Sequence, residues 1–189
     1  GSGIETTFTQ GEDACLASLV PGLPPEAPDA PASLMVVGTL ADVVEDQFAR
    51  LFAQLGIGPV HFFPPRRAGA MPAIGPHTKL LLAQPFLADP ARALEARGAT
   101  RLPAPFPLGA EGTTLWLQAA ARAFDIGDEL FERVTKPGHE RARTALTRQR
   151  ATLAGKRVFF FPDSQLEIPV ARFLSRELGM QLTEVGTPY

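Results

Sequence analysis

Residues 34–63 read LMVVGTLADVVEDQFARLFAQLGIGPVHFF, and this stretch decides the fold. Its first four residues, 34–37, are all apolar and end at a glycine, which is typical of a strand buried on both faces of a parallel sheet. Residues 42–55 place apolar side chains on one face of a helix, and a glycine follows them. Residues 60–63 predict a second strand, closed by two prolines. The order strand, helix, strand predicts a parallel β-α-β unit with a right-handed crossover.

The same alternation continues along the sequence. Further strands are predicted at residues 79–83, 100–104, 157–161 and 181–185, the second of which is weak. Further helices are predicted at residues 89–98, 113–124, 128–154 and 168–178, and the polar third one is interrupted by Pro137 and Gly138. Residues 21–31 contain five prolines and are expected to form a linker. We therefore expect an α/β protein with parallel sheets.

Composition limits the class of protein. The 189 residues are 45% hydrophobic and 20% charged, which suits a packed core and argues against a disordered chain. A formal charge of -2 gives no overall basic field for nucleic acid. The longest apolar stretches, such as residues 79–83, are far shorter than the roughly 20 residues of a membrane helix. The single cysteine, Cys15, excludes an internal disulfide and indicates a reducing, cytoplasmic compartment.

The segment before the linker predicts a short helix whose first turn contains residues 11–13 and whose apolar part is residues 14–20. Glu12 and Asp13 would then lie in its first turn, where the helix dipole favours acids. Cys15 lies among small and apolar residues, which favours buried packing over a role as a thiolate ligand.

The sequence offers no set of metal ligands. One cysteine does not hold an iron–sulfur cluster, which usually takes four thiolates. The three histidines are not spaced as metal ligands, and we expect His61 to be structural and His77 and His139 to be solvated.

Ligands of open parallel sheets bind at the carboxyl ends of the strands, so the loops after strands are candidate sites. Residues 163–167, DSQLE, bring two acids, an amide and a hydroxyl directly after an apolar strand. One interpretation is that this loop contributes to a site. The other is that Asp163 or Ser164 only caps the following helix.

Two further loops carry weaker signals. No Walker lysine loop and no GxGxxG motif is present, which argues against a bound nucleotide. The corner at residues 112–114 predicts a helix N-terminus with a threonine cap, whose free N–H groups could hold an anion or a propionate. Arg66 and Arg67 are expected to be a solvated loop pair or an interface patch.

Four runs of sequence carry a family resemblance. They are GSGIETTFTQGED at residues 1–13, VVEDQF at 43–48, PFPLGAEGTTLW at 105–116 and FFPDSQLEIP at 160–169. With them the chain resembles, over essentially its whole length, the N-subunit family of light-independent (dark-operative) protochlorophyllide reductases, which is nitrogenase-like. The resemblance implies that Gly1-Ser2-Gly3 continues a family motif and is not a cloning remnant. It also implies that the chain is an internal segment of a longer subunit.

The resemblance implies an activity that needs partners. N and B subunits of this family form an N2B2 heterotetramer, and a separate ATP-hydrolysing iron–sulfur L protein docks to deliver electrons. A 4Fe-4S cluster between N and B passes them to protochlorophyllide and reduces the double bond between carbons 17 and 18 of ring D, which gives chlorophyllide a. The cluster cysteines are expected upstream of Gly1. No metal ligand and no certain catalytic residue is therefore assigned within this sequence.

Three other functions stay open at this point. The nitrogenase-like architecture is also that of non-catalytic cofactor-assembly scaffolds, and of chlorophyllide reductase, which acts on a different ring of the pigment. An unrelated Rossmann-like small-molecule binder is the remaining alternative.

By analogy with nitrogenase molybdenum-iron proteins, the chain should contain Rossmann-like three-layer units around a shared cavity. Residues 1–31 would end a first domain and add the linker, 32–135 would form a second, 136–154 a connecting helix, and 155–189 the start of a further one. A pigment cavity needs apolar walls and few polar groups. The residues that the analogy places on its rim are Gln10, Glu12, Asp163, Gln165 and Glu167.

Overall fold

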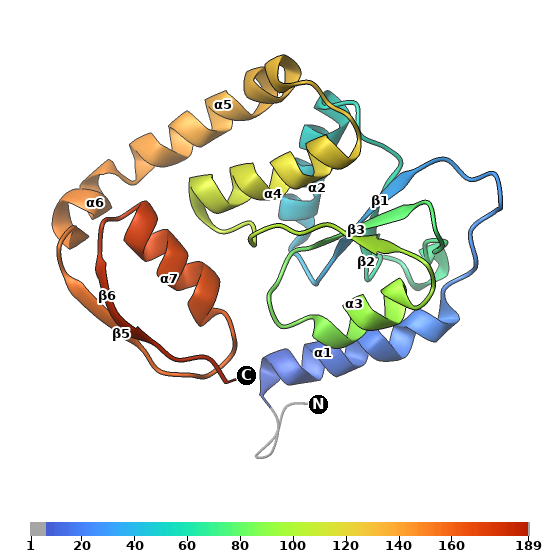
Figure 1. Cartoon of the computed structure of the whole chain (residues 1–189), viewed down its shortest axis with the longest axis horizontal. Coiled ribbons are helices and arrows are strands. Elements are labelled where there is room, and N and C mark those ends of the chain that lie inside the picture. The colour runs from blue at the N-terminus through green and yellow to red at the C-terminus, as the bar shows by residue number, and fades with distance from the viewer. Residues whose placement is uncertain (1–6, 189) are drawn as a thin grey trace.

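The computed structural model describes residues 7–188 and contains two parallel β-sheets with helices packed on them. The predictions over Gly1-Ser2-Gly3 and Tyr189 lie outside the described residues. Figure 1 shows the two sheets at opposite ends of the molecule, with α4 between them. The elements in chain order are α1 (Phe8–Leu19), η1 (Val20–Gly22), β1 (Ser33–Val37), α2 (Asp42–Gln54), β2 (Val60–Phe63), η2 (Ala68–Ala70), β3 (Thr78–Leu82), α3 (Ala88–Glu95), β4 (Thr100–Arg101), α4 (Gly109–Ala123), α5 (Asp128–Ala145), α6 (Thr147–Leu153), β5 (Arg157–Phe160), α7 (Glu167–Arg176) and β6 (Gln181–Val185). The predicted α/β fold with parallel sheets is confirmed.

The larger sheet is built around β1. Its strand order is β2-β1-β3-β4, and each neighbouring pair is parallel. Every residue of β1 is buried, as the apolar run predicted. Successive side chains of a strand point to opposite faces, so Leu34 and Val36 enter one core while Met35 and Val37 enter another. The sheet therefore needs a helical layer on each face.

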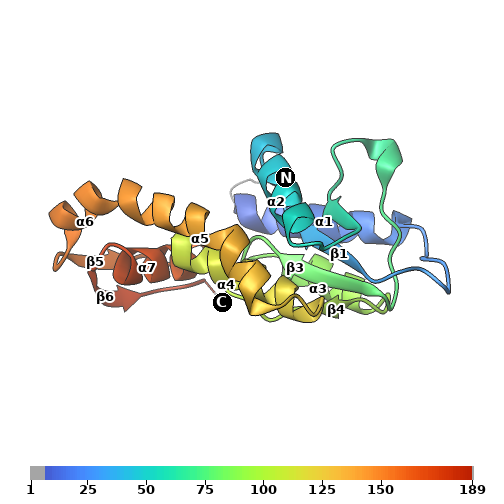
Figure 2. The ribbon, with the colours of Figure 1, turned by 90° about the horizontal axis from the view of Figure 1, so that it is seen from above.

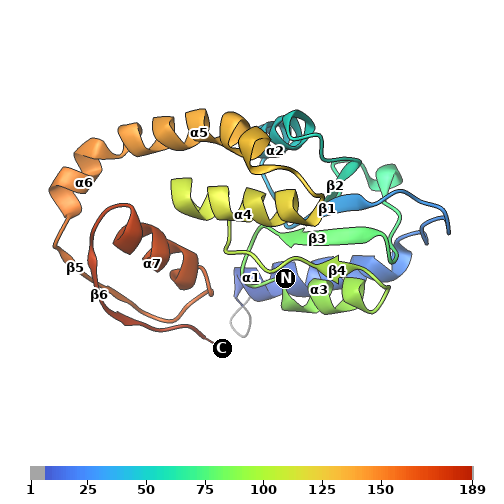
Figure 3. The same ribbon diagram turned by 45° about the horizontal axis from the view of Figure 1, so that its top comes forward.

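The two layers are visible in Figure 3, which shows α2, α4 and α5 on one side of the sheet and α1 and α3 on the other. The first layer packs around Trp116, whose ring centre lies 4.7 Å from that of Phe48 and 5.7 Å from that of Phe52. The Trp116 indole N–H donates a 2.7 Å hydrogen bond to the Leu82 carbonyl at the end of β3. In the second layer α1 packs on α3.

Among residues 7–188, no helix is long and apolar enough to cross a membrane.

Helix α1 begins earlier than predicted. Thr7 and Gln10 form a capping box: the Thr7 hydroxyl accepts from the Gln10 N–H, and the Gln10 side chain accepts from the Thr7 N–H at 2.9 Å. The predicted first turn at residues 11–13 is therefore wrong, and Glu12 and Asp13 lie beyond the first turn. Cys15 is exposed, so the prediction that it is buried is also wrong.

Two more helix boundaries differ from the prediction. Helix α4 begins at Gly109, four residues before the predicted start at 113. Helix α5 runs through Pro137 and ends only at Ala145, before the separate short helix α6. Pro137 is exposed, as is Arg133 one turn earlier, so water can reach the carbonyl that the missing N–H leaves unpaired. Figure 2 shows α5 and α6 leading from the side of α4 to the smaller sheet.

The smaller sheet consists of β5 and β6, which are parallel and joined by α7. It is poorly covered: all residues of β6 are exposed, and Phe159 and Phe161 keep 56% and 75% of their surface accessible. Parallel sheets are normally covered on both faces. This β-α-β unit packs on the rest of the chain through α7, which contacts α4.

Candidate functional site

The carboxyl ends of β1 and β3 are joined to α1 by its acidic residues. The Glu12 carboxylate accepts a 3.1 Å hydrogen bond from the Thr39 N–H, directly after β1. The Asp13 carboxylate accepts from the Asp89 N–H at 3.0 Å, in the first turn of α3. Burial raises the pKa of Asp13 above its usual value, although the hydrogen bond from Asp89 acts in the opposite direction. The two acids therefore hold the loop tips, and the structure gives both of them intramolecular partners.

Gln84 completes this first group of loop residues. Its amide donates a 3.2 Å hydrogen bond to the Thr39 carbonyl, while its Oε1 is buried without a donor among the described residues. Gly38 has a φ of +134°, and a Cβ there would come within 3.0 Å of that Oε1. Gln84 lies in one of the loops after strands where candidate sites were expected, but it was not among the predicted rim residues. Its position directly after a predicted strand was the available signal.

Glu167 organises the loop between β5 and α7. Its side chain is only 6% exposed, and Oε1 accepts from the Asp163 N–H at 3.0 Å, the Ser164 N–H at 2.8 Å and the Ser164 hydroxyl at 3.3 Å. Burial alone would raise the pKa of Glu167, but these hydrogen bonds and one from its own backbone outweigh burial and lower it. Oε2 has no donor within residues 7–188.

The other predicted residues of this loop have smaller structural roles. Asp163 is exposed and contributes its N–H to Glu167, and Gln165 is half-buried with a φ of +68°. Neither side chain of Asp163 or Ser164 caps α7, whose N-cap residue is Leu166. The interpretation that Asp163 or Ser164 caps the following helix is therefore wrong, and Glu167 holds the loop instead.

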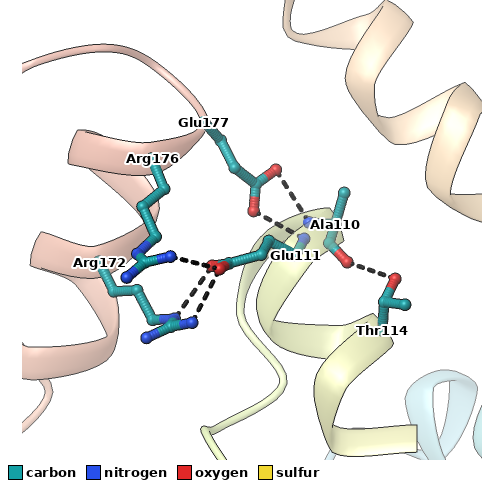
Figure 4. A network of polar contacts seen from close by, with 6 residues as sticks. All are labelled: Ala110, Glu111, Thr114, Arg172, Arg176 and Glu177. Carbon is teal, nitrogen blue, oxygen red and sulfur yellow. Dashed lines mark hydrogen bonds and ion pairs between the residues drawn. The ribbon is translucent and has the colours of Figure 1, made fainter. Parts of the chain in front are cut away.

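The start of α4 is closed by an acid from α7. The Glu177 carboxylate accepts from the Ala110 N–H at 2.9 Å and from the Glu111 N–H at 3.0 Å, as Figure 4 shows. The predicted threonine cap at residues 112–114 is wrong, since Thr114 lies inside the helix and donates to the Ala110 carbonyl. The helix N-terminus that was predicted to attract an anion is thus already occupied by the Glu177 carboxylate.

A second acid–base contact lies beside Glu177. The Arg172 guanidinium meets the Glu111 carboxylate with two hydrogen bonds, of 2.9 Å and 2.7 Å, and Arg176 adds a third at 3.0 Å (Figure 4). Glu111, Arg176 and Glu177 line one side of a cleft of about 860 Å³. Its lining comes from the start of α4, from α5 and α6, and from the end of α7: Ala110, Glu111, His139, Glu140, Arg143, Thr144, Leu146, Thr147, Arg150, Arg176 and Glu177.

Arg66 is an exposed loop residue, as predicted, but it also forms ion pairs that were not predicted. Its guanidinium contacts the carboxylates of Glu45, Asp46 and Asp42 on α2, and the Glu45 side chain is buried. The hydrogen bonds to Glu45 and then Asp46 raise the pKa of Arg66. Arg67, its neighbour, is exposed.

The histidines have ordinary structural surroundings. His61 is half-buried in β2, and burial lowers its pKa. His77, predicted to be solvated, donates from its backbone to Glu26 at 2.7 Å and meets the same carboxylate through its ring. His139 contacts the Thr114 hydroxyl at 2.9 Å.

The described residues do not fit an iron–sulfur cluster. No group of three or more His, Cys, Asp or Glu side chains in residues 7–188 is arranged to hold a metal ion, and the one thiol, Cys15, stands exposed on α1. We therefore derive no step through a cluster from this chain.

The predicted rim residues fall into two groups. Gln10 and Glu12 lie on α1, where Gln10 serves the helix cap, and Asp163, Gln165 and Glu167 lie in the β5–α7 loop. In Figures 1 and 3 this loop lies on the side of the smaller sheet that faces the beginning of α1. No hydrogen bond joins the two groups in the part of the chain that the structure describes.

Comparison with known proteins identifies close relatives. The chain matches the family of nitrogenase component 1 type oxidoreductases over residues 2–189. It is 71% identical over 189 residues to the light-independent protochlorophyllide reductase subunit N of Rhodospirillum rubrum and to that of a strain of Rhodopseudomonas palustris, and 69% identical to that of a Bradyrhizobium species. Each alignment covers 100% of this chain and 43% or 44% of the relative. The chain thus spans less than half the length of these curated relatives.

Proposed function

This chain belongs to the family of nitrogenase component 1 type oxidoreductases, and from that membership we propose that it is part of the N subunit of a light-independent protochlorophyllide reductase. The observation that carries the proposal is 71% identity over the whole chain to two subunits of that name. The chain spans 43% of the length of such a relative, so we propose the activity for the complete subunit and not for this segment alone.

The proposed reaction adds two electrons and two protons to the double bond between carbons 17 and 18 of ring D of protochlorophyllide, which gives chlorophyllide a. We propose that the chain works in an N2B2 heterotetramer in the cytoplasm, and that an ATP-hydrolysing L protein supplies the electrons. A 4Fe-4S cluster shared with the B subunit would carry them, with ligands outside this segment, since the chain offers one exposed thiol. Binding and orienting the pigment is the task left to the residues described above.

The loops at the carboxyl ends of the strands are the proposed pigment wall. Three buried side-chain oxygens lack a donor in residues 7–188: Gln84 Oε1, Glu167 Oε2 and Thr187 Oγ1. They follow β3, β5 and β6 respectively. Buried polar atoms without partners are rare in native proteins and call for a water or a ligand. Gln84 follows a strand of the larger sheet, and Glu167 and Thr187 follow strands of the smaller one, which supports the loops after the strands as places where a further group binds.

We also propose the domain division expected from the sequence, with residues 32–135 as one Rossmann-like unit, 136–154 as the connection and 155–189 as the start of another. The parallel pairing of β5 and β6 supports the last unit. So does the exposure of Phe159 and Phe161, because a two-stranded parallel sheet with bare apolar side chains needs further strands or helices to cover it.

The test is pigment turnover by the complete subunit that contains this segment, assembled with its B and L partners, ATP and a reductant. Chlorophyllide formation is followed by absorbance. We expect Glu167→Gln to lower turnover about tenfold or more, a typical cost of disturbing a positioned group, while the melting temperature changes little. Glu132→Gln, which alters an exposed acid of α5 away from the strand ends, is the matched control and should keep wild-type turnover.

The outcomes separate the alternatives. An assembled wild-type complex that binds protochlorophyllide without reducing it would support a scaffold instead, and one that reduces only chlorophyllide would support the sister enzyme. Unchanged turnover in Glu167→Gln would reduce that residue to a structural role in the loop.

A further inference from the structure

The contact between α7 and α4 decides where the smaller sheet sits. β5 and β6 pair with each other, β6 packs on α7, and α7 is the element of this unit that packs on α4. Glu167 begins α7 and Arg176 ends it, so the loop with the buried Glu167 and the contact with α4 lie at opposite ends of one helix. A helix of ten residues is about 15 Å long. Whatever fixes the far end of α7 therefore also fixes the loop.

The far end is fixed by four charged side chains, which we call the α4–α7 clamp: Glu111, Arg172, Arg176 and Glu177. Glu177 accepts from two N–H groups of the first turn of α4. Glu111, in that same turn, accepts from Arg172 and Arg176, which lie one turn apart on α7. An acid at a helix N-terminus and a base at a helix C-terminus are the charges that the two helix dipoles favour.

The backbone at the start of α4 is shaped to admit Glu177. Gly109 has a φ of +74°, and a Cβ there would overlap both the Glu177 carboxylate and the Phe173 ring. Gly112 is equally restricted, because its Cβ would lie 2.7 Å from the Phe106 carbonyl oxygen. The glycines of the GAEG run at residues 109–112 thus serve the approach of α7 and the turn before α4.

The geometry of the clamp is directional. The Arg172–Glu111 pair is bidentate, and the Glu177 carboxylate spans two adjacent N–H groups, so both contacts hold one orientation of α7 as well as one distance. Apolar contacts between helices allow small sliding motions that such paired hydrogen bonds do not. The side chains are only partly buried, with 27% of the Glu111 side chain and 33% of the Arg172 side chain exposed, so salt should weaken them.

We propose that the α4–α7 clamp is the positioning device for the β5–α7 loop, and that Glu177 and Gly109 set the placement of Glu167 against the larger sheet. The catalytic part of this inference rests on the proposed function. A tilt of α7 by about 4° about its clamped end would move its other end, about 15 Å away, by about 1 Å. A displacement of about 1 Å in a positioning element can cost about 100-fold in rate.

The placement is tested first, in the 189-residue chain, without any pigment. Cys15 is an exposed native thiol on α1, and Glu184→Cys adds an exposed one on β6. Spin labels at these two positions report the distance between the larger and the smaller sheet. We expect a narrow distance distribution that broadens in Glu177→Gln and shifts in Gly109→Ala. Glu140→Gln, another acid of the same cleft outside the clamp, should leave it unchanged.

The reaction is tested second, in the assembled reductase. Glu177→Gln should lower kcat/KM about tenfold or more with little change in the melting temperature, and Glu140→Gln should not. A distance distribution that neither broadens in Glu177→Gln nor shifts in Gly109→Ala overturns the clamp. A broadened distribution with unchanged kcat/KM overturns its role in the reaction. A wild-type complex that reduces no pigment refutes the proposed function, while the distance measurement still decides the clamp.

Discussion

Replacing Trp116 by phenylalanine tests how α4 is held on the end of β3. The indole is fully buried between Phe48 and Phe52, and its N–H donates to the Leu82 carbonyl at 2.7 Å. Phenylalanine keeps an aromatic ring in this place but has no donor. The Leu82 carbonyl then loses its side-chain partner, which costs about 1–3 kcal/mol.

The smaller ring adds a packing term. The phenyl ring buries about two carbon atoms fewer than the indole. At about 0.8 kcal/mol per buried carbon group, this loss costs about 1.6 kcal/mol. The sum for Trp116→Phe is therefore about 3–5 kcal/mol. At about 2–4 °C per kcal/mol for a chain of this size, the melting temperature should fall by about 10 °C.

Guanidinium unfolding followed by far-UV circular dichroism measures the change, because the substitution removes the only tryptophan and with it the fluorescence signal. Phe131→Leu is the control: Phe131 is buried in the same core and loses apolar atoms but no donor, so it should cost only about 1–2 kcal/mol. Equal costs for the two variants would refute the reasoning, since the hydrogen bond to Leu82 would then contribute nothing.

Two further predictions concern charged groups. Arg66→Gln leaves the buried Glu45 carboxylate without its cationic partner and should lower the melting temperature by several degrees. The control Arg67→Gln, at the exposed neighbouring position, should leave the melting temperature nearly unchanged. Equal melting curves for the two variants would contradict the role of the ion pair. The lowered pKa of Glu167 means that its stabilisation is fully present above the ordinary value of 4.5 and is lost as the pH falls through the lower folded value. Hydrogen exchange of the Ser164 amide should therefore be slower in the wild type than in Glu167→Gln, by about 1–2 kcal/mol of protection at pH 7. This difference in protection should shrink below pH 4.5. A difference that does not depend on pH would disprove the role of the ionised Glu167 carboxylate.

The central strands could be predicted because their signal is local. A strand buried on both faces must be apolar at every position, and β1 shows this in consecutive residues of the sequence. The edge strand β4 has both residues exposed, so nothing in its composition marks where it ends, and the predicted strand at 100–104 shrank to Thr100–Arg101. The start of α1 was also readable, since Thr7 and Gln10 have the spacing of a capping box.

The partners of charged residues could not be predicted in the same way. Glu177 accepts from N–H groups 66 and 67 positions away, and Arg172 meets Glu111 across 61 positions. Only the spacing of Arg172 and Arg176, one helical turn apart, hinted at a shared partner. Arg66 illustrates the same limit, because its exposure could be predicted from the sequence but its carboxylate partners on α2 could not.

These long-range contacts also change what the candidate site can bind. The sequence suggested that a helix N-terminus could hold the propionate of a pigment, but Asp13 already accepts from the first turn of α3 and Glu177 from that of α4. An anion at either place would have to displace a carboxylate of the protein and face its repulsion. The unsatisfied groups at the strand ends are hydrogen-bond acceptors and not donors, because the Gln84 and Glu167 oxygens lack a donor. These strand ends therefore suit a group or a water that donates hydrogen bonds, and under the proposed function the carboxylate of the pigment should find its cation elsewhere in the assembly.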